Sequence, residues 1–188
     1  MAATVVEAAA ADRLLTEEVA LVDRSERGKL ALTADGERVA LEVIRHHRLL
    51  ELYLAESLDV PWDRVHAEAE VLEHVLSEEL EALIAAKLGN PTVDPHGDPI
   101  PTADLVMEER PTSPLADLAP GARATFVRIS DSDPEMLRYL AERGIAPGDD
   151  FEVIDKQPFD GPTFARFGDD VHVLGGALAH AMRAQVSA

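Results

Sequence analysis

Residues 65–74 read VHAEAEVLEH, and they place two histidines and three glutamates inside the pattern of an amphipathic helix. At about 100° per residue, one apolar arc of this helix contains Val65, Ala69, Leu72, Leu76, Leu80 and Leu83. A second arc, which borders the apolar one, contains His66, Glu70, Glu73 and His74. The first arc is the predicted core face, so the second is predicted to be half-buried.

A half-buried carboxylate is unfavourable unless a positive charge compensates it. Two imidazoles and two carboxylates on one arc therefore suit a divalent cation. Nitrogen and oxygen ligands without sulfur favour manganese, ferrous iron, cobalt or zinc over copper(I).

A second group of metal-capable residues precedes this helix in RHHRLLE, residues 45–51. His47 and Glu51 are spaced i, i+4 and face the same way on a helix. Antiparallel packing of the two helices would bring them against His66. The alternative interpretation is ordinary solvated charge, which is common on glutamate-rich helix faces. The other histidines are interpreted as surface or structural residues: His46, His96, His172 and His180.

The pattern of the N-terminal half predicts a helix, a hairpin and two long helices. The first 20 residues favour helix by propensity, and residues 21–36 have the pattern of a β-hairpin. Thr33 is the predicted N-cap of a helix from Ala34 to Leu58. A second helix is predicted from Trp62 to Leu88, where Gly89-Asn90-Pro91 ends it.

The apolar residues of the C-terminal half follow a different period from those of the N-terminal half. Loop-forming prolines follow the second helix, and ERPTSP at 109–114 reads as a linker. Short strand-like pieces and two helical pieces follow, and they predict a small SH3-like β-barrel. The strand-like pieces are residues 124–129, 147–155, 163–168 and 171–175, and the helical pieces are 133–144 and 176–184.

Composition excludes several classes of function. The 188 residues include no cysteine, so disulfides, thiolate metal sites and a cysteine nucleophile are excluded. The net charge is −19, from 17 basic and 36 acidic residues, which repels a phosphate backbone unless positive charge is gathered in one place or a cation is bound. Neither a signal peptide nor a membrane-spanning segment is recognisable, and a cytoplasmic location is expected.

Three segments resemble the diphtheria-toxin-repressor family of metal-dependent transcription regulators, which includes iron-dependent regulators and manganese transport regulators. They are RHHRLLELYL (45–54), VPWDRVHAEAEVLEHVLSEELE (60–81) and NPTVDPHGDPIP (90–101). Residues 129–154, ISDSDPEMLRYLAERGIAPGDDFEVI, resemble the FeoA-like, SH3-type domain that many members carry.

The resemblance implies an α+β fold in four parts. These are a partial winged helix (1–33), a helical metal-binding and dimerisation domain (34–108), a linker (109–114) and a FeoA-like SH3-type domain (115–188).

The resemblance also implies the metal ligands. By position, His47, Glu51 and His66 match ancillary-site ligands. Glu70, Glu73 and His74 match primary-site ligands, and Asp131 is the candidate that completes the ancillary site. Glu70 stands where iron-type members carry cysteine, and a hard carboxylate at this position suits Mn²⁺ or Fe²⁺. One or two of these ions are therefore expected, with Co²⁺, Ni²⁺ or Zn²⁺ as surrogates.

The N-terminus departs from the family pattern. Family members begin with a complete helix-turn-helix, and by comparison this chain starts about thirty residues late, so an N-terminally truncated member is expected. GKLALTADG (28–36) matches the wing, and residues 5–18 occupy the place of the recognition-helix end. Arg24, Arg27 and Lys29 are the candidate phosphate contacts.

Two functions follow from these observations. The first is a homodimeric, metal-dependent transcription regulator, a repressor of metal-homeostasis genes that binds operator DNA. The alternative is a metal-binding dimerisation module without DNA binding of its own, which the acidic charge favours. An enzyme is not expected, because the sequence has no HExxH motif, no candidate nucleophile and no glycine-rich phosphate loop.

Overall fold

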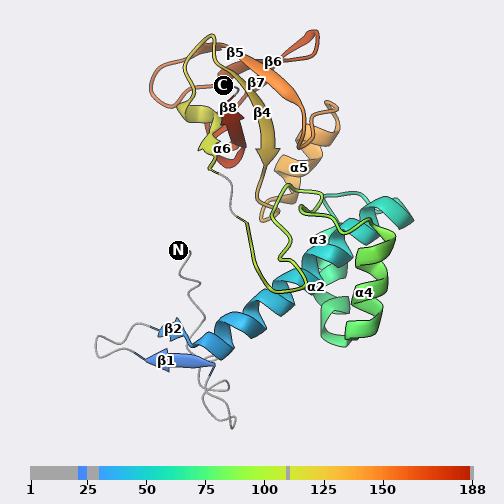
Figure 1. Ribbon diagram of the computed structural model, residues 1–188. Coiled ribbons are helices and arrows are strands. Elements are labelled where there is room, and N and C mark those ends of the chain that lie inside the picture. The colour runs from blue at the N-terminus through green and yellow to red at the C-terminus, as the bar shows by residue number, and fades with distance from the viewer. Residues whose placement is uncertain (1–20, 25–29, 109–110, 187–188) are drawn as a thin grey trace.

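The computed structural model describes residues 21–24, 30–108 and 111–186. A β-hairpin leads into a long helix, a helical unit follows, and a sheet-containing C-terminal unit lies at the opposite end (Figure 1). We call residues 34–101 the helical unit and residues 113–186 the C-terminal unit. None of the helices in the described residues has the length and apolarity needed to cross a bilayer.

The hairpin and the start of the long helix follow the sequence closely. Strands β1 (Val22–Arg24) and β2 (Leu30–Leu32) pair antiparallel. Helix α2 (Ala34–Leu58) has the predicted bounds, and the Thr33 side chain accepts a hydrogen bond from the Gly36 amide as its N-cap. The predicted N-terminal helix lies outside the described residues, so a winged-helix remnant is not confirmed beyond this hairpin.

The prediction of one continuous helix from Trp62 to Leu88 is wrong, because this segment forms three shorter pieces. These are α3 (Val65–Leu72), the 3-10 turn η1 (Glu73–Val75) and α4 (Glu78–Lys87). The break falls at Leu76, which is extended, and Ser77 caps α4 by accepting from the Leu80 amide. A capping serine before an acidic first turn is a helix-start signal, and here it interrupts the apolar periodicity.

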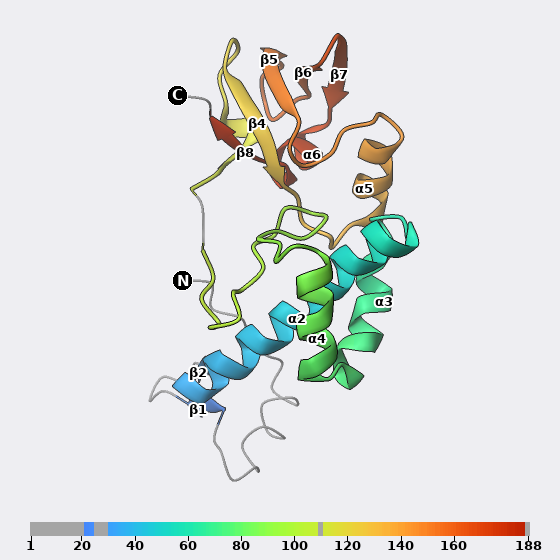
Figure 2. The same ribbon diagram turned by 45° about the vertical axis from the view of Figure 1, so that its right-hand side comes forward.

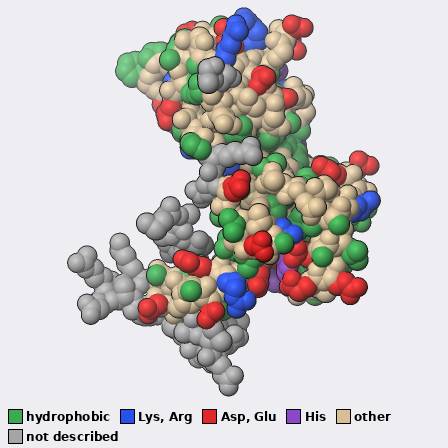
Figure 3. All heavy atoms as spheres, viewed as in Figure 1, with side chains coloured by type: hydrophobic (Ala, Val, Ile, Leu, Met, Phe, Trp, Pro, Cys, Tyr) green, Lys and Arg blue, Asp and Glu red, His purple; other side chains and the backbone are tan. Residues whose placement is uncertain are grey.

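The break changes which apolar residues are buried. Val65 and Ala69 pack with Leu49, Ile84 and other residues of the helical core, as the predicted core face requires. Leu72, Leu80 and Leu83 are exposed instead, together with Val71 and Val75. Figure 3 shows hydrophobic side chains among acidic ones on the surface of the helical unit.

The C-terminal unit contains a six-stranded antiparallel sheet in the order β3-β8-β4-β5-β6-β7. Its strands are β3 (Ser113–Pro114), β4 (Arg123–Arg128), β5 (Asp150–Lys156), β6 (Thr163–Phe167), β7 (Asp170–Leu174) and β8 (Arg183–Val186). Its helical elements are η2 (Leu115–Asp117), α5 (Pro134–Ala141) and α6 (Gly176–Ala181). Strand β8 was not predicted, because the sequence pattern extended the last helix over its first residues.

An SH3-like β-barrel was expected here, and no closed barrel is found: the sheet is open within the described residues. Closure would require β7 to pair with β3, which has only two residues and includes a proline. At the other edge, the Tyr139 hydroxyl of α5 donates to the Val173 carbonyl of β7. A helix therefore occupies the edge that closure would need.

The helical unit contacts the C-terminal unit through its loop of residues 90–101 (Figures 1 and 2). The Ile129 amide donates to the His96 carbonyl, and Arg128 pairs with Asp98 at 3.2 Å. Gly97 has a φ of +85°, and a Cβ there would lie 1.8 Å from the Val127 carbonyl oxygen. Only glycine fits this close backbone approach.

Replacing Gly97 by alanine should therefore destabilise the contact between the units. Gly121 is a matched control, because it has the same φ of +85° with nothing within 4 Å of its Cβ position. Both alanine variants carry left-handed strain of about 1 kcal/mol, and Gly97→Ala should lose about 1–3 kcal/mol more through the clash. Urea denaturation measures both losses, and equal losses would contradict the tight junction.

Candidate metal centre

Helix α2 presents His47 and Glu51 on adjacent turns toward the start of α3. Glu51 is 1 % exposed, and its Oε1 lies 3.1 Å from Nε2 of His47. His66, in the first turn of α3, places Nδ1 3.1 Å from His47 Nε2 and 3.4 Å from Glu51 Oε1. The antiparallel arrangement expected from the sequence thus brings these three side chains together.

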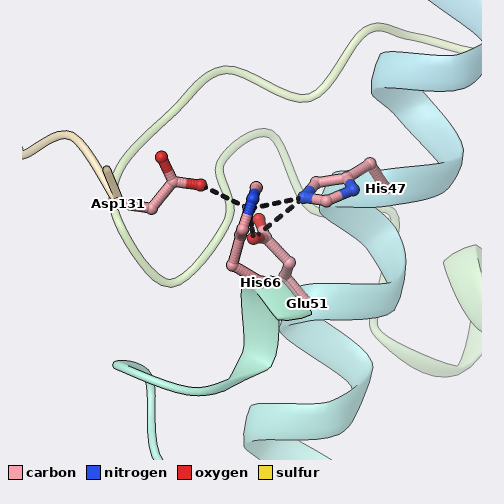
Figure 4. Close-up of side chains that lie close together, drawn as sticks. All are labelled: His47, Glu51, His66 and Asp131. Atoms are coloured by element: carbon pink, nitrogen blue, oxygen red, sulfur yellow. Dashed lines mark hydrogen bonds and ion pairs between the residues drawn. The ribbon is translucent and has the colours of Figure 1, made fainter. Parts of the chain in front are cut away.

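Asp131 joins them from the C-terminal unit, in the segment that connects β4 to α5. Its Oδ2 lies 2.7 Å from Nδ1 of His66 (Figure 4). The donor atoms of these four residues all lie within 4.8 Å of one another. We call His47, Glu51, His66 and Asp131 the metal cluster.

The metal cluster fits one divalent cation. Ligand atoms held about 2.1 Å from one ion lie about 3 Å apart when they occupy adjacent coordination positions. Neighbouring donor atoms of the metal cluster lie 2.7 to 3.4 Å apart, which matches this spacing. Two imidazole nitrogens and two carboxylate oxygens are a donor set suited to Mn²⁺ or Fe²⁺.

Glu73 contacts the ring nitrogen of His47 that points away from Glu51 and His66. Its Oε2 lies 2.6 Å from His47 Nδ1, while the other ring nitrogen, Nε2, faces Glu51 and His66. A carboxylate on one imidazole nitrogen fixes the tautomer and leaves the second nitrogen free to bind a metal. Glu73 therefore holds the orientation of the His47 ring, a contact that depends on the 3-10 turn η1.

The charges of His47 and Glu51 support each other. Burial lowers the pKa of His47, but hydrogen bonds and charges of Glu51 and Glu73 outweigh it and raise the pKa to about 9. Burial raises the pKa of Glu51, but interactions with His47 and His96 outweigh it and lower the pKa to about 2. A proton on His47 balances the carboxylates in the metal-free chain, and a cation can take over that role.

The remaining predicted ligands lie apart from the metal cluster. Glu70 is exposed and belongs to none of the metal-capable groups among the described residues. His74 is exposed, and its Nε2 lies 4.0 Å from Glu73 Oε1. Within the described residues, these two side chains are not gathered around a common point.

The candidate DNA contacts lie largely outside the described residues. Arg27 and Lys29 fall in the undescribed segment 25–29. Arg24 is in β1, but its side chain is outside the description. Their predicted role stays a prediction.

A buried group behind Glu51 was missed in the sequence. His96 and Asp94, from the loop between the units, are buried beside Glu51 and form a metal-capable group with it. Burial and the charges of Asp98 and Glu51 raise the pKa of Asp94 to about 7. The sequence gives no signal for the burial of His96, because a histidine in a Pro- and Gly-rich loop is usually exposed.

A further metal-capable group is His46, Glu78 and Glu81. Glu81 already binds the buried guanidinium of Arg45 at 2.7 Å, and Arg45 also donates to the Pro101 carbonyl. This group therefore ties α4 and the loop to α2, which is a structural role.

Known families match both units. Residues 33–102 match the iron dependent repressor, metal binding and dimerisation domain, and residues 113–186 match the FeoA domain. The iron-dependent repressor IdeR of Mycobacterium leprae (strain TN) is 47 % identical over 172 residues, which cover 83 % of this chain and 73 % of the relative.

Two further relatives agree with these matches. IdeR of Mycobacterium tuberculosis (strain ATCC 25618 / H37Rv) is 32 % identical over 168 residues, with the same coverage of 83 % and 73 %. A solved structure of a manganese-dependent transcriptional repressor in complex with manganese superposes with a TM-score of 0.86 and 41 % identity. It covers 95 % of this chain and 83 % of that one.

Proposed function

Because the chain belongs to the family of metal-dependent transcriptional repressors that includes IdeR and the diphtheria toxin repressor, we propose that Mn²⁺ or Fe²⁺ bound by the metal cluster controls its binding to operator DNA. Members of this family are not enzymes, so the role of the cluster is regulatory. The proposed role places the chain in the cytoplasm, with the genes that it regulates.

One observation carries the proposal: the metal cluster takes its ligands from separate parts of the chain. His47 and Glu51 come from α2, His66 comes from α3, and Asp131 comes from the C-terminal unit. A ligand that contacts several segments stabilises the arrangement in which they lie together. Metal concentration can therefore bias the relative placement of the two units.

The charge balance explains why this arrangement responds to metal. A bound divalent cation supplies the positive charge that two carboxylates in close contact require. Without it, Glu51 faces His47 and His96, and Asp131 faces His66. Asp131 is the member of the metal cluster that the C-terminal unit supplies, so loss of the metal would weaken one of the ties between that unit and the helices.

A second ion is proposed at Glu70, Glu73 and His74. They follow one another along α3 and η1, and Glu73 already contacts His47, a ligand of the metal cluster. Because Glu70 and His74 are exposed, they would need to move together or to gain a ligand from residues outside the described ranges. Binding of the second ion would then depend on the segment that supplies this additional ligand.

Replacing His66 by alanine should remove one equivalent of Mn²⁺, or weaken its binding at least tenfold, because a direct ligand is lost. His180→Ala is a matched control, since both histidines are about half exposed, 47 % and 48 %, and each pairs with an aspartate. Calorimetric titration of the metal-free chain measures both. Equal Mn²⁺ binding by the two variants, or none by the parent chain, would overturn the proposed site.

A homodimer is proposed through the exposed apolar residues of α3, η1 and α4. The residues are Val71, Leu72, Val75, Leu80 and Leu83. Exposed aliphatic side chains concentrated in so short a segment are unfavourable in water and are typical of an interface. The match of residues 33–102 to a dimerisation domain supports the same location.

The variant Leu83→Glu should shift the chain from dimer to monomer, because a carboxylate would be buried in the apolar interface. Val173→Glu is the control, since Val173 is also an exposed aliphatic residue but lies on β7 of the C-terminal unit. Sedimentation equilibrium should give twice the chain mass of 20.3 kDa for the parent and for Val173→Glu. A dimeric Leu83→Glu variant would place the interface elsewhere.

DNA binding is proposed through the hairpin and the segments beside it, with Arg24, Arg27 and Lys29 as phosphate contacts. In a gel-shift assay, the parent chain should retard a family-type palindromic duplex with Mn²⁺ but not with EDTA. The His66→Ala variant should lose this response. A chain that binds Mn²⁺ and dimerises but retards no DNA would instead support a dimerisation module, which the net charge of −19 favours.

A further inference from the structure

His96 lies directly behind Glu51 and is almost completely enclosed, with 1 % of its surface exposed. Its ring stacks on Trp62 with the centroids 5.8 Å apart and an angle of 18° between the planes. Its Nε2 lies 2.8 Å from the Trp62 carbonyl oxygen. Since a carbonyl only accepts hydrogen bonds, Nε2 must carry the hydrogen of this contact.

The opposite side of the His96 ring lies against Glu51, a residue of the metal cluster. Nδ1 of His96 is 3.8 Å from Oε2 of Glu51, and it has no hydrogen-bond partner among the described residues. Glu51 directs its other oxygen, Oε1, to His47 and His66. His96 therefore borders the oxygen of Glu51 that does not face the metal cluster.

The main chain of His96 contacts the other unit. Its carbonyl accepts from the Ile129 amide at 2.9 Å, two residues before Asp131. The neighbouring Gly97 packs on Val127, and Asp98 pairs with Arg128. One residue thus touches the glutamate ligand with its side chain and the strand end that carries the aspartate ligand with its main chain.

We propose that His96 is a positioning residue of the metal cluster, which holds Glu51 through its imidazole and Asp131 through its carbonyl. The inference rests on the proposed metal site. A glutamate side chain has several rotatable bonds, and a group that packs against its outer oxygen lowers the entropy lost when the inner oxygen binds a cation. Arg48, which lies 3.8 Å from Asp94 and 3.4 Å from Asp98, holds the loop that supplies His96.

Two amide variants separate the roles of the two ring nitrogens. Asparagine at position 96 places its amide nitrogen near the position of Nδ1, and glutamine places it near Nε2. His96→Gln can keep the bond to Trp62 but leaves nothing opposite Glu51, so its dissociation constant for Mn²⁺ should rise about tenfold or more. His96→Asn should stay within about threefold of the parent, because its amide keeps a polar group packed opposite Glu51.

A double-mutant cycle with Glu51→Gln tests whether His96 acts through Glu51. Adding His96→Gln to Glu51→Gln should cause no further loss of Mn²⁺ affinity. A purely structural effect would give the same additional loss in both backgrounds, and that result would overturn the proposal. Parent-like Mn²⁺ binding by His96→Gln would also overturn it, while leaving the proposed function intact.

The stoichiometry distinguishes positioning from ligation. If His96→Gln binds one Mn²⁺ fewer than the parent, then His96 is itself a ligand and the positioning role is wrong. If the parent binds no Mn²⁺, the proposed function fails first. Both outcomes come from the same calorimetric titration.

A measurement on the unaltered ring covers the case in which the variants do not fold. In the full chain labelled with ¹⁵N-histidine, Zn²⁺ as a diamagnetic probe should shift the His96 ring resonances without the change expected of a coordinated nitrogen. The shift should be absent in Glu51→Gln. His96 resonances that Zn²⁺ leaves unchanged in the parent would overturn the inference.

Discussion

A single buried carboxylate, that of Glu51, is the constraint on which the rest of the site depends. It is 1 % exposed in the middle of α2, and an uncompensated charge there would cost several kcal/mol. His47, His66 and His96 surround it from three different segments. The positions of α3 and of the loop 90–101 can therefore be understood as the compensation that this one group requires.

The same stretch of α2 also anchors the junction between the units. Arg45 donates to the Pro101 carbonyl, and Arg48 reaches Asp94 and Asp98, so the loop is fixed in its middle and at its C-terminal end. The loop in turn bonds to the end of β4, shortly before Asp131. Because proposed metal ligands and junction residues alternate along one helix, the proposed metal binding and the placement of the units would be parts of one network.

The acidic character of the chain is consistent with this arrangement. A net charge of −19 opposes both dimerisation and approach to DNA, and each bound divalent cation removes two units of it. The exposed aliphatic residues of α3 and α4 supply an attraction that does not depend on charge. The proposed regulator thus combines an apolar interface with a charge balance that metal adjusts.

The sequence alone determined the local features, since their signals lie within a few residues. The Thr33 cap, the bounds of α2, the end of α4 at Gly89-Asn90, and the pairing of His47 with Glu51 all follow from contacts three to four residues apart or from turn chemistry. Antiparallel packing of the two helices predicted His66 as their partner, and the family resemblance added Asp131. Tertiary structure decided the place of Glu73 beside His47, the burial of His96 and the open edge of the sheet. These depend on contacts such as Glu73 with His47 or Tyr139 with Val173, which join residues 26 and 34 positions apart, and no local periodicity records them.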